Sequence, residues 1–189
     1  MRYGMVIDLK RCSGCKTCSV VCKVANNIPN NIIWNRVLTE GGNAPDTAGG
    51  TWDNPEMQHW PVACQHCENP ACTKVCPVGA TWKDEQTGIV RQDYDKCIGC
   101  RMCMAACPYN ARSFNWEEPV RDVDFNYGDA EVPVRPRGVA EKCTLCRERT
   151  DRGEEPMCVV SCPTHARIFG DLDDPASEVS KAVVERKAH

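Results

Sequence analysis

The cysteine spacing constrains this chain more than any other feature of its sequence. Cys97, Cys100, Cys103 and Cys107 follow the spacing C-x2-C-x2-C-x3-C, with a proline directly after the last cysteine. Three cysteines three residues apart can fold a short loop around one metal–sulfur cube. The fourth comes one helical turn later and faces away from that loop, so it is available to a second cluster. One such run therefore predicts a partner run.

The partners are three further runs, and the four runs together use all 16 cysteines of the chain. The first run repeats the spacing of the third. The second has four residues between its second and third cysteines, and the fourth has eleven there. A longer loop delays the third ligand without removing it. The predicted iron ligands are Cys12, Cys15, Cys18 and Cys22 in the first run; Cys64, Cys67, Cys72 and Cys76 in the second; Cys97, Cys100, Cys103 and Cys107 in the third; and Cys143, Cys146, Cys158 and Cys162 in the fourth.

Disulfides, zinc and iron–sulfur clusters are the three explanations for so many cysteines in 189 residues. Disulfide frameworks suit short secreted chains, and residues Met1–Asp8 lack the apolar segment of a secretory signal. Zinc sites use pairs of cysteines separated by a longer spacer and have no use for a third closely spaced cysteine. We therefore predict four [4Fe–4S] clusters, one for each complete set of four ligands.

The composition excludes several classes of partner. The net charge is −3 with 26% charged residues, which is typical of an ordinary soluble surface and does not indicate nucleic acid binding. No apolar run approaches the ~20 residues of a membrane helix, so we expect no direct membrane insertion. The apolar core should be small, and bound clusters should stabilise the fold directly.

Local patterns predict a few short elements. Residues Tyr3–Leu9 alternate like a strand, Cys18–Ala25 should form a short helix, and residues 80–93 read as a hairpin. Ile168 and Phe169 should form another strand. Asp174 as N-cap and Pro175 at the first helical position predict a last helix over residues 176–189. Its apolar stripe comprises Val179, Ala182 and Val183.

Two segments are insertions relative to a small ferredoxin, residues 26–59 and 113–140. The first contains the stretch Gly41–Gly50, which is rich in glycine and is expected to be a loop. Trp34 and Trp52 lie in this first insertion, and Trp60 directly follows it. These tryptophans either cover clusters and fill the core or take part in a subunit interface. The second insertion should be an extended connector that crosses the surface.

Several polar residues beside the runs have two interpretations. Gly14 and Gly99 each lie between the first two cysteines of a run, where positive φ lets N–H groups turn towards sulfur. His66 lies inside the second run; we do not expect it to be an iron ligand, because four cysteines are already present there, but it is a candidate hydrogen-bond donor to sulfur. His59 and His165 are expected to be structural or at the surface. Lys10, Arg11, Lys96 and Lys142 precede three runs and either form solvated surface or raise cluster potentials.

An internal repeat organises the chain into pairs of runs. The pattern C-P-x-x-A recurs at Cys76–Ala80, Cys107–Ala111 and Cys162–Ala166. The unit is strand, cysteine loop, short helix and strand, and two units make one two-cluster domain. We therefore predict an α+β fold with two bacterial-ferredoxin-like two-cluster domains and long loop insertions. No residue set typical of catalysis is present, so we predict no catalytic residues and no enzyme activity of the chain by itself.

The chain resembles the four-cluster iron–sulfur subunit of the dimethyl sulfoxide reductase (molybdopterin oxidoreductase) family, and is similar to the iron–sulfur subunits of polysulfide and arsenate reductases. The resemblance rests on the order of the four runs, their two unusual spacings and the ending Phe169–Pro175. It implies an electron-transfer subunit that serves a large molybdopterin-containing catalytic subunit, with an integral membrane quinone-reactive subunit as a second partner. Membrane association would come from partners, or the chain would be exported with a partner that carries a twin-arginine signal. A cytoplasmic location is the alternative.

The resemblance also implies how the runs pair. The first run pairs with the fourth and the second with the third, so that residues 1–25 and 141–175 form one domain and residues 60–112 form the other. The implied ligand sets are Cys12, Cys15, Cys18 and Cys162; Cys143, Cys146, Cys158 and Cys22; Cys64, Cys67, Cys72 and Cys107; and Cys97, Cys100, Cys103 and Cys76.

The sequence does not exclude two other functions. The chain could be a related electron-transfer subunit of a hydrogenase, formate dehydrogenase or carbon monoxide dehydrogenase system, because the module is similar in all of them. It could also be a zinc-stapled interaction protein, which would be colourless where an iron–sulfur protein is brown.

Overall fold

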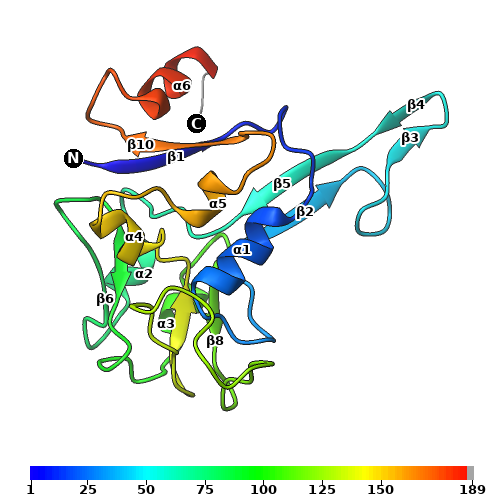
Figure 1. Ribbon diagram of the computed structural model, residues 1–189. Helices are drawn as coiled ribbons and strands as arrows, with labels where there is room; N and C mark the ends of the chain where they lie inside the picture. The colour runs from blue at the N-terminus through cyan, green and yellow to red at the C-terminus, as the bar shows by residue number, and fades with distance from the viewer. Residues whose placement is uncertain (187–189) are drawn as a thin grey trace.

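The protein consists of short helices and two-stranded sheets connected by long loops (Figure 1). A computed structural model describes residues 1–186. Its elements are β1 Tyr3–Ile7, α1 Thr17–Ala25, β2 Arg36–Glu40, β3 Gly49–Thr51, β4 Asn54–Glu56, β5 Gln58–Val62, α2 Ala71–Lys74, β6 Thr81–Lys83, β7 Val90–Gln92, α3 Met102–Ala105, β8 Arg112–Phe114, β9 Ala140–Lys142, α4 Arg147–Asp151, α5 Met157–Val160, β10 Arg167–Asp171 and α6 Glu178–Arg186. The predicted mixture of small helices and strands is confirmed.

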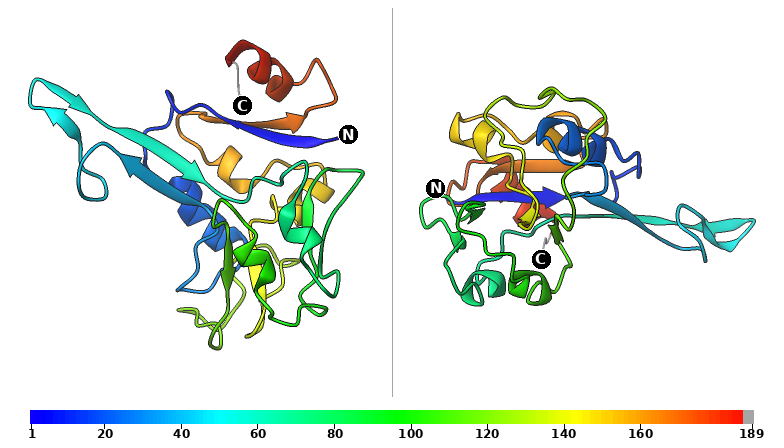
Figure 2. Two further views of the ribbon diagram at one scale, coloured as in Figure 1. Left: turned by 180° about the vertical axis from the view of Figure 1, so that it is seen from behind. Right: turned by 90° about the horizontal axis from the view of Figure 1, so that it is seen from below.

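The two ends of the chain lie together. Strand β1 pairs antiparallel with β10, so that Val6 stands opposite Ile168, and α6 covers this sheet (Figures 1 and 2). Val6 is buried with Val179 and Ala182 of α6. The predicted apolar stripe is therefore confirmed as the contact between α6 and the sheet formed by the chain ends.

The last helix begins later than the sequence predicted. Asp174 accepts a hydrogen bond from the N–H of Ala176 at 2.8 Å, which makes a turn, and the helix starts at Glu178. The hydroxyl of Ser177 accepts the N–H of Ser180 at 3.2 Å, the bond that an N-cap residue makes. Ser177 therefore caps the helix in place of Asp174. The last three residues of the predicted helix, 187–189, lie outside the described residues.

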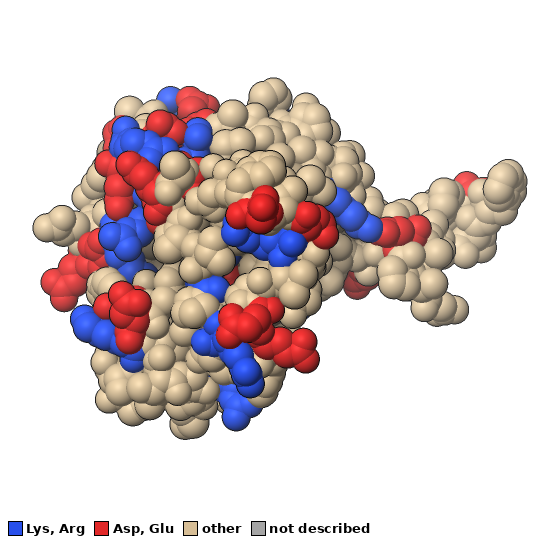
Figure 3. Space-filling view, turned by 60° about the horizontal axis from the view of Figure 1, so that its bottom comes forward, with Lys and Arg blue, Asp and Glu red and all other residues tan. Residues whose placement is uncertain are grey.

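A long two-stranded arm extends from the body (Figures 1 and 2). Strand β2 pairs with β5, and β3 pairs with β4 near the tip. The predicted loop over Gly41–Gly50 is wrong at its end, because Gly49 and Gly50 belong to β3. The arm is mainly uncharged in Figure 3, whereas the body carries intermixed acidic and basic side chains. Trp52 at the tip is fully exposed, and Trp34 at the base is 3% exposed.

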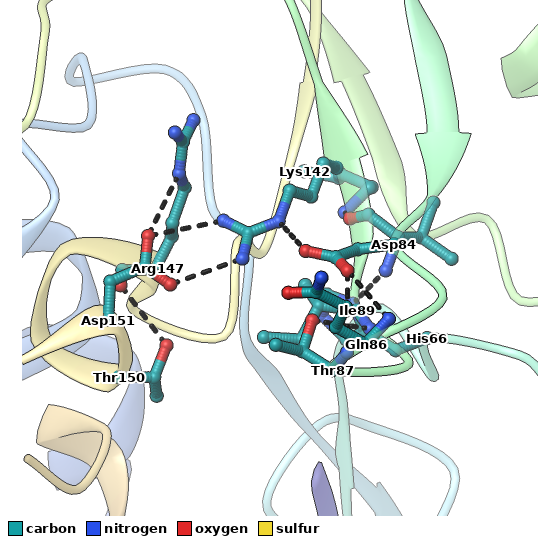
Figure 4. A network of polar contacts seen from close by, with 11 residues as sticks. His66, Asp84, Gln86, Thr87, Ile89, Lys142, Arg147, Thr150 and Asp151 are labelled. Atoms are coloured by element: carbon teal, nitrogen blue, oxygen red, sulfur yellow. Dashed lines mark hydrogen bonds and ion pairs between the residues drawn. The ribbon is translucent and has the colours of Figure 1, made fainter. Parts of the chain in front are cut away.

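The middle of the chain is attached to its later part by ion pairs. The predicted hairpin is confirmed as β6 and β7, with Thr81 opposite Gln92. Arg91 of this hairpin donates to Asp84 at 2.6 Å and to Asp151 of α4 at 3.1 Å (Figure 4). One guanidinium therefore joins the β6–β7 hairpin to α4. Within residues 1–186, no helix is long and apolar enough to span a membrane.

A buried ion pair organises the core beneath the two insertions. Arg135 donates to Glu141 at 3.0 Å, and neither side chain is exposed to solvent. Trp34 and Asn115 also donate to the carboxylate of Glu141. Arg135 further donates to the carbonyl of Asn26 at 2.7 Å and stacks 4.8 Å from the Trp34 ring. The pair therefore links the first insertion, the second insertion and β9.

The prediction of a surface connector over residues 113–140 is wrong in part. Val132, Arg135 and Val139 are buried, and Phe114 and Ala140 pair at the ends of the segment in β8 and β9. The sequence shows no period here because isolated side chains, rather than a regular element, enter the core.

We expect the substitution Glu141→Gln to destabilise the protein by about 3–5 kcal/mol, because it leaves the buried Arg135 charge without a counter-charge. The denaturant midpoint, followed by circular dichroism under anaerobic conditions, measures this loss. Glu178→Gln is the control, since Glu178 is 82% exposed in its pair with Lys181 and should change stability by less than about 0.5 kcal/mol. Equal midpoints for the two variants would contradict the expected role of the buried pair.

Candidate metal centres

The loop between the first two cysteines has the same backbone conformation in all four runs. The residue directly before the second cysteine has φ of 68° at Gly14, 43° at His66, 69° at Gly99 and 60° at Leu145. The positive φ predicted for the two glycines is confirmed. His66 and Leu145 adopt the same conformation although they carry side chains, which is uncommon for residues other than glycine.

Close neighbours explain why two of these positions are glycine. A Cβ at Gly14 would overlap the ring of His59 in β5, and a Cβ at Gly99 would lie 2.5 Å from the carbonyl of Gly138. Strand β5 of the arm therefore packs against the first cysteine run, and the second insertion packs against the third cysteine run. The prediction that His59 is structural is consistent with this contact.

The cysteines line four cavities, and each cavity combines three cysteines of one run with a cysteine of another. We name them cavities A to D. Cavity B is also lined by a fifth cysteine, Cys64. Within residues 1–186, no group of three or more His, Cys, Asp or Glu side chains is compact enough for a single metal ion. The linings are Cys12, Cys15, Cys18 and Cys162 in cavity A; Cys143, Cys146, Cys158 and Cys22 in cavity B; Cys64, Cys67, Cys72 and Cys107 in cavity C; and Cys97, Cys100, Cys103 and Cys76 in cavity D.

Burial and crowding make the thiols of cavity B poor acids. Burial raises the pKa of Cys143 to about 12, and the neighbouring thiolates of Cys64 and Cys146 add to the rise. Burial likewise raises the pKa of Cys158 to about 11. The pKa of Cys22 also lies well above its usual range, through burial first and then the three other thiolates of the cavity. Since metal ligation deprotonates cysteine, iron would supply the positive charge that these buried thiolates need.

The repeated C-P-x-x-A pattern has a physical explanation in the structure. In each copy the N–H of the final alanine points back at the sulfur of the cysteine four residues earlier. Such N–H groups stabilise a thiolate that ligates a cluster. The three bonds run from Ala80 to Cys76 at 3.2 Å, from Ala111 to Cys107 at 3.5 Å and from Ala166 to Cys162 at 3.3 Å.

Two arginines that the sequence analysis did not single out also donate to cysteine sulfur. Arg112 contacts the sulfur of Cys72 at 3.2 Å, and Arg167 contacts the sulfur of Cys158 at 3.7 Å. Both directly follow the final alanine of a C-P-x-x-A pattern. That shared position is the signal that could have identified them.

The side chain of His66 is buried, and one of its two ring nitrogens has no hydrogen-bond partner among residues 1–186. Its Nδ1 accepts the N–H of Val90 at 3.1 Å, and its Nε2 is buried without a partner in the described part of the chain. Burial, and then the charges of Lys142 and Arg112, hold its pKa well below the usual range, so the ring is neutral and Nε2 carries the proton. His66 lines cavity B. A cluster, with its several acceptor sulfurs, fits the chemistry of this site.

The basic residues before the runs differ in their surroundings. Lys96 has a side chain that is 65% exposed, and Lys10 is exposed, as the surface interpretation predicts. Lys142 is 1% exposed, so the surface interpretation is wrong for this residue. It donates to the carbonyls of Val90 at 2.5 Å and Cys143 at 2.9 Å, both beside the cysteine cavities.

Comparisons with known proteins find a 4Fe-4S domain family and electron-transfer subunits of reductases. The 4Fe-4S dicluster domain family matches residues 55–125 and 130–172, which is more than half of the chain. A Halobacterium salinarum protein provisionally named as a dimethyl sulfoxide reductase iron-sulfur subunit is 55% identical, over 99% of this chain and 72% of the relative. The arsenate respiratory reductase iron-sulfur subunit of a Shewanella strain is 39% identical, over 97% of this chain and 87% of the relative. The thiosulfate reductase electron transfer subunit of Salmonella typhi is also 39% identical, over 100% of this chain and 84% of the relative.

The dicluster match and the 16 cysteines fit four [4Fe–4S] clusters. We therefore expect about sixteen iron atoms and about sixteen acid-labile sulfides per chain. Iron and sulfide analysis after anaerobic purification measures both. Bound zinc with no labile sulfide would contradict this content.

Proposed function

Because this chain belongs to the 4Fe-4S dicluster family, we propose that it relays single electrons between a molybdopterin-containing catalytic subunit and a second redox partner. The chain is a non-catalytic iron–sulfur subunit. Each bound cluster accepts and releases one electron. The protein's own residues hold the clusters, exclude water from them and donate hydrogen bonds to their sulfurs.

The lining of the four cavities is the observation that carries this proposal. Cavities A, C and D are each lined by four cysteines and cavity B by five, and we propose the four sets given above as the ligands of one cubane each. The proposed ligands in cavities A and B come from residues 1–25 and 141–175, and those in cavities C and D come from residues 60–112; Cys64 lines both cavity B and cavity C. We therefore propose two ferredoxin-like domains with these boundaries. The pairing of β1 with β10 supports the first of them.

Residues that the cavities share place them in the order A, B, C, D. Arg167 lines both cavity A and cavity B, and Cys64 lines both cavity B and cavity C. Arg112, which lines cavity C, donates to the hydroxyl of Thr81, which lines cavity D, at 2.9 Å. Neighbouring clusters would therefore lie close enough for electrons to pass along one line.

The two ends of this line reach the surface. Cys15 of cavity A and Cys100 of cavity D are the two exposed cysteines. The arm leaves the body beside cavity A, whose lining includes Val37 and Pro61 of its strands. We propose that the catalytic subunit binds at this end, held by the arm with its exposed Trp52.

The distal partner would bind near cavity D. Ile98, Met102 and Trp116 are exposed around this cavity, with Arg101 stacked on Trp116 at 4.5 Å. We propose a membrane subunit that reacts with quinone as the distal partner, and membrane association through it. Export together with a partner that carries a twin-arginine signal is part of the same proposal.

We expect the chain to co-purify from its native cell with a large molybdopterin-containing subunit. The reason is that the chain is a non-catalytic cluster-binding subunit with exposed apolar side chains on the arm and near cavity D. Affinity purification followed by mass spectrometry and molybdenum analysis tests this. We also expect a variant with Trp52→Ser to keep its four clusters and to recover several-fold less of the large subunit. A chain that is recovered alone, with full cluster content, would contradict the proposal.

We expect Cys22→Ser to perturb the cluster of the fourth run and to leave the cluster held by Cys12, Cys15 and Cys18 at its normal potential. The reason is that Cys22 lines cavity B and not cavity A. Electron paramagnetic resonance of the reduced protein, during a potentiometric titration, measures each cluster. The matched variant Cys162→Ser should do the reverse. Loss of the first run's own cluster in Cys22→Ser would exclude the crossed arrangement.

A further inference from the structure

Four lysine or arginine side chains are buried within residues 1–186, and only one of them is paired with a carboxylate. Arg135, at 1% exposure, has Glu141 as its counter-charge at 3.0 Å. Arg112, Lys142 and Arg167, at 3%, 1% and 5% exposure, form no ion pair with a carboxylate in this described range. A buried charge without a counter-charge is costly. Their counter-charges should therefore be the clusters themselves.

Arg167 lies between cavities A and B. It lines both of them. Its guanidinium contacts the sulfur of Cys158 in cavity B and donates to the side-chain oxygen of Asn35 at 3.0 Å. Burial lowers the pKa of Arg167, and the surrounding cysteine thiolates, first those of Cys158 and Cys18, together raise it above its usual value. Because Arg167 lines both cavities, this one cation faces both.

Arg112 lies between cavities C and D: it lines cavity C and donates to Gln92 and Thr81, which line cavity D. Its guanidinium donates to the sulfur of Cys72 in cavity C and to the hydroxyl of Thr81 at 2.9 Å. Burial lowers the pKa of Arg112, and the surrounding cysteine thiolates, first those of Cys72 and of Cys103 in cavity D, together raise it above its usual value. Arg112 and Arg167 occupy the same position of the sequence repeat, so each pair of runs supplies one such arginine.

Lys142 lies at the remaining gap, between cavities B and C. Its ammonium donates to the carbonyls of Val90 and Cys143. Lys142 therefore reaches from β9 to the β6–β7 hairpin (Figure 4). Val90 lines cavity C and Cys143 lines cavity B, so the ammonium lies between these two cavities. Burial, with the charge of Arg112, leaves the pKa of Lys142 below its usual value, although the thiolates of Cys64 and Cys143 favour its charged form. The three unpaired buried cations thus occupy the three gaps of the four-cavity line.

We propose that Arg167, Lys142 and Arg112 form a row of buried cations between the four clusters, each acting as the shared counter-charge of the two clusters beside it. The proposal rests on the ligand sets proposed above. One-electron reduction adds one negative charge to a cluster and breaks no bond. A nearby fixed cation stabilises that reduced form and raises the reduction potential. Because each cation serves two clusters, its loss should lower two neighbouring potentials together.

Lys142→Gln tests this most directly, since glutamine keeps a hydrogen-bond donor and removes the charge. The full chain, purified anaerobically with its native partners, is titrated potentiometrically and followed by electron paramagnetic resonance. We expect the clusters of cavities B and C to move to lower potential together, while those of cavities A and D move less. Cys22→Ser and Cys107→Ser identify the signals of the clusters in cavities B and C.

Lys96→Gln is the matched control. Lys96 directly precedes the first cysteine of the third run, as Lys142 precedes that of the fourth, but its side chain is 65% exposed. All four potentials should stay at their normal values in this variant. Arg167→Gln should lower the potentials of the clusters in cavities A and B, and Arg112→Gln those in C and D. Unchanged potentials in Lys142→Gln, an equal shift of all four clusters, or an equal shift in Lys96→Gln would overturn the proposal.

If Lys142→Gln loses clusters, a second variant that restores the charge, Lys142→Arg, distinguishes the loss of the charge from a loss of packing. Four clusters with near-normal potentials in Lys142→Arg support the shared counter-charge. Failure of Lys142→Arg to hold four clusters would assign a packing role to Lys142 and overturn the proposal. The iron and sulfide content of the unchanged protein is measured first. A content below four clusters contradicts the ligand sets, and that failure is distinct from a failure of the counter-charge.

Discussion

The rest of this structure depends on the burial of cysteine sulfurs close to one another. Burial and neighbouring thiolates raise the pKa of Cys143 to about 12, so deprotonating several cysteines of one cavity is unfavourable without a metal. Bound iron would favour deprotonation, because its positive charge balances the negative charge of the thiolates. The backbone bonds to sulfur, such as that from Ala80 to Cys76, then act on charged thiolates and gain strength. We therefore expect cluster binding to stabilise the folded state of this protein directly.

The small apolar core follows from the same constraint. Buried hydrophobic side chains gather in two small clusters, one around Val6 and Val179 and one around Ile28 and Trp34. Much of the remaining interior is polar, and buried polar groups must find partners. The Arg135–Glu141 pair satisfies this requirement with carboxylate and carbonyl oxygens. It also attaches both insertions to the centre of the molecule.

Electrostatic balance differs between the two kinds of buried cation. Arg135 has a protein carboxylate and so needs nothing from a cofactor. Arg112 and Arg167 face cysteine sulfur, and the clusters supply the negative charge beside them. A chain of anions in a protein interior is unstable by itself, and cations between them lower the repulsion. Structural stability and redox tuning would then depend on the same residues.

The sequence by itself determined the cofactor chemistry, because cysteine spacing within a run is a local property. It also determined the short elements that local patterns encode, such as the helix over Thr17–Ala25 and the hairpin that contains Thr81. The last helix was misplaced because its cap depends on how Ser177 and Asp174 share nearby N–H groups. The arm was missed because its strands are short and their partners are separated by a glycine-rich stretch.

Only the tertiary structure decided which runs meet and which basic residues are buried. Lys96 and Lys142 stand at the same place before a run, yet one is exposed and the other lies between two cavities. No local pattern separates them, since burial is set by the segments that pack around a residue. The cavity linings are likewise decided by long-range packing, which brings Cys162 beside Cys12. Charge placement relative to the clusters is therefore a property of the fold.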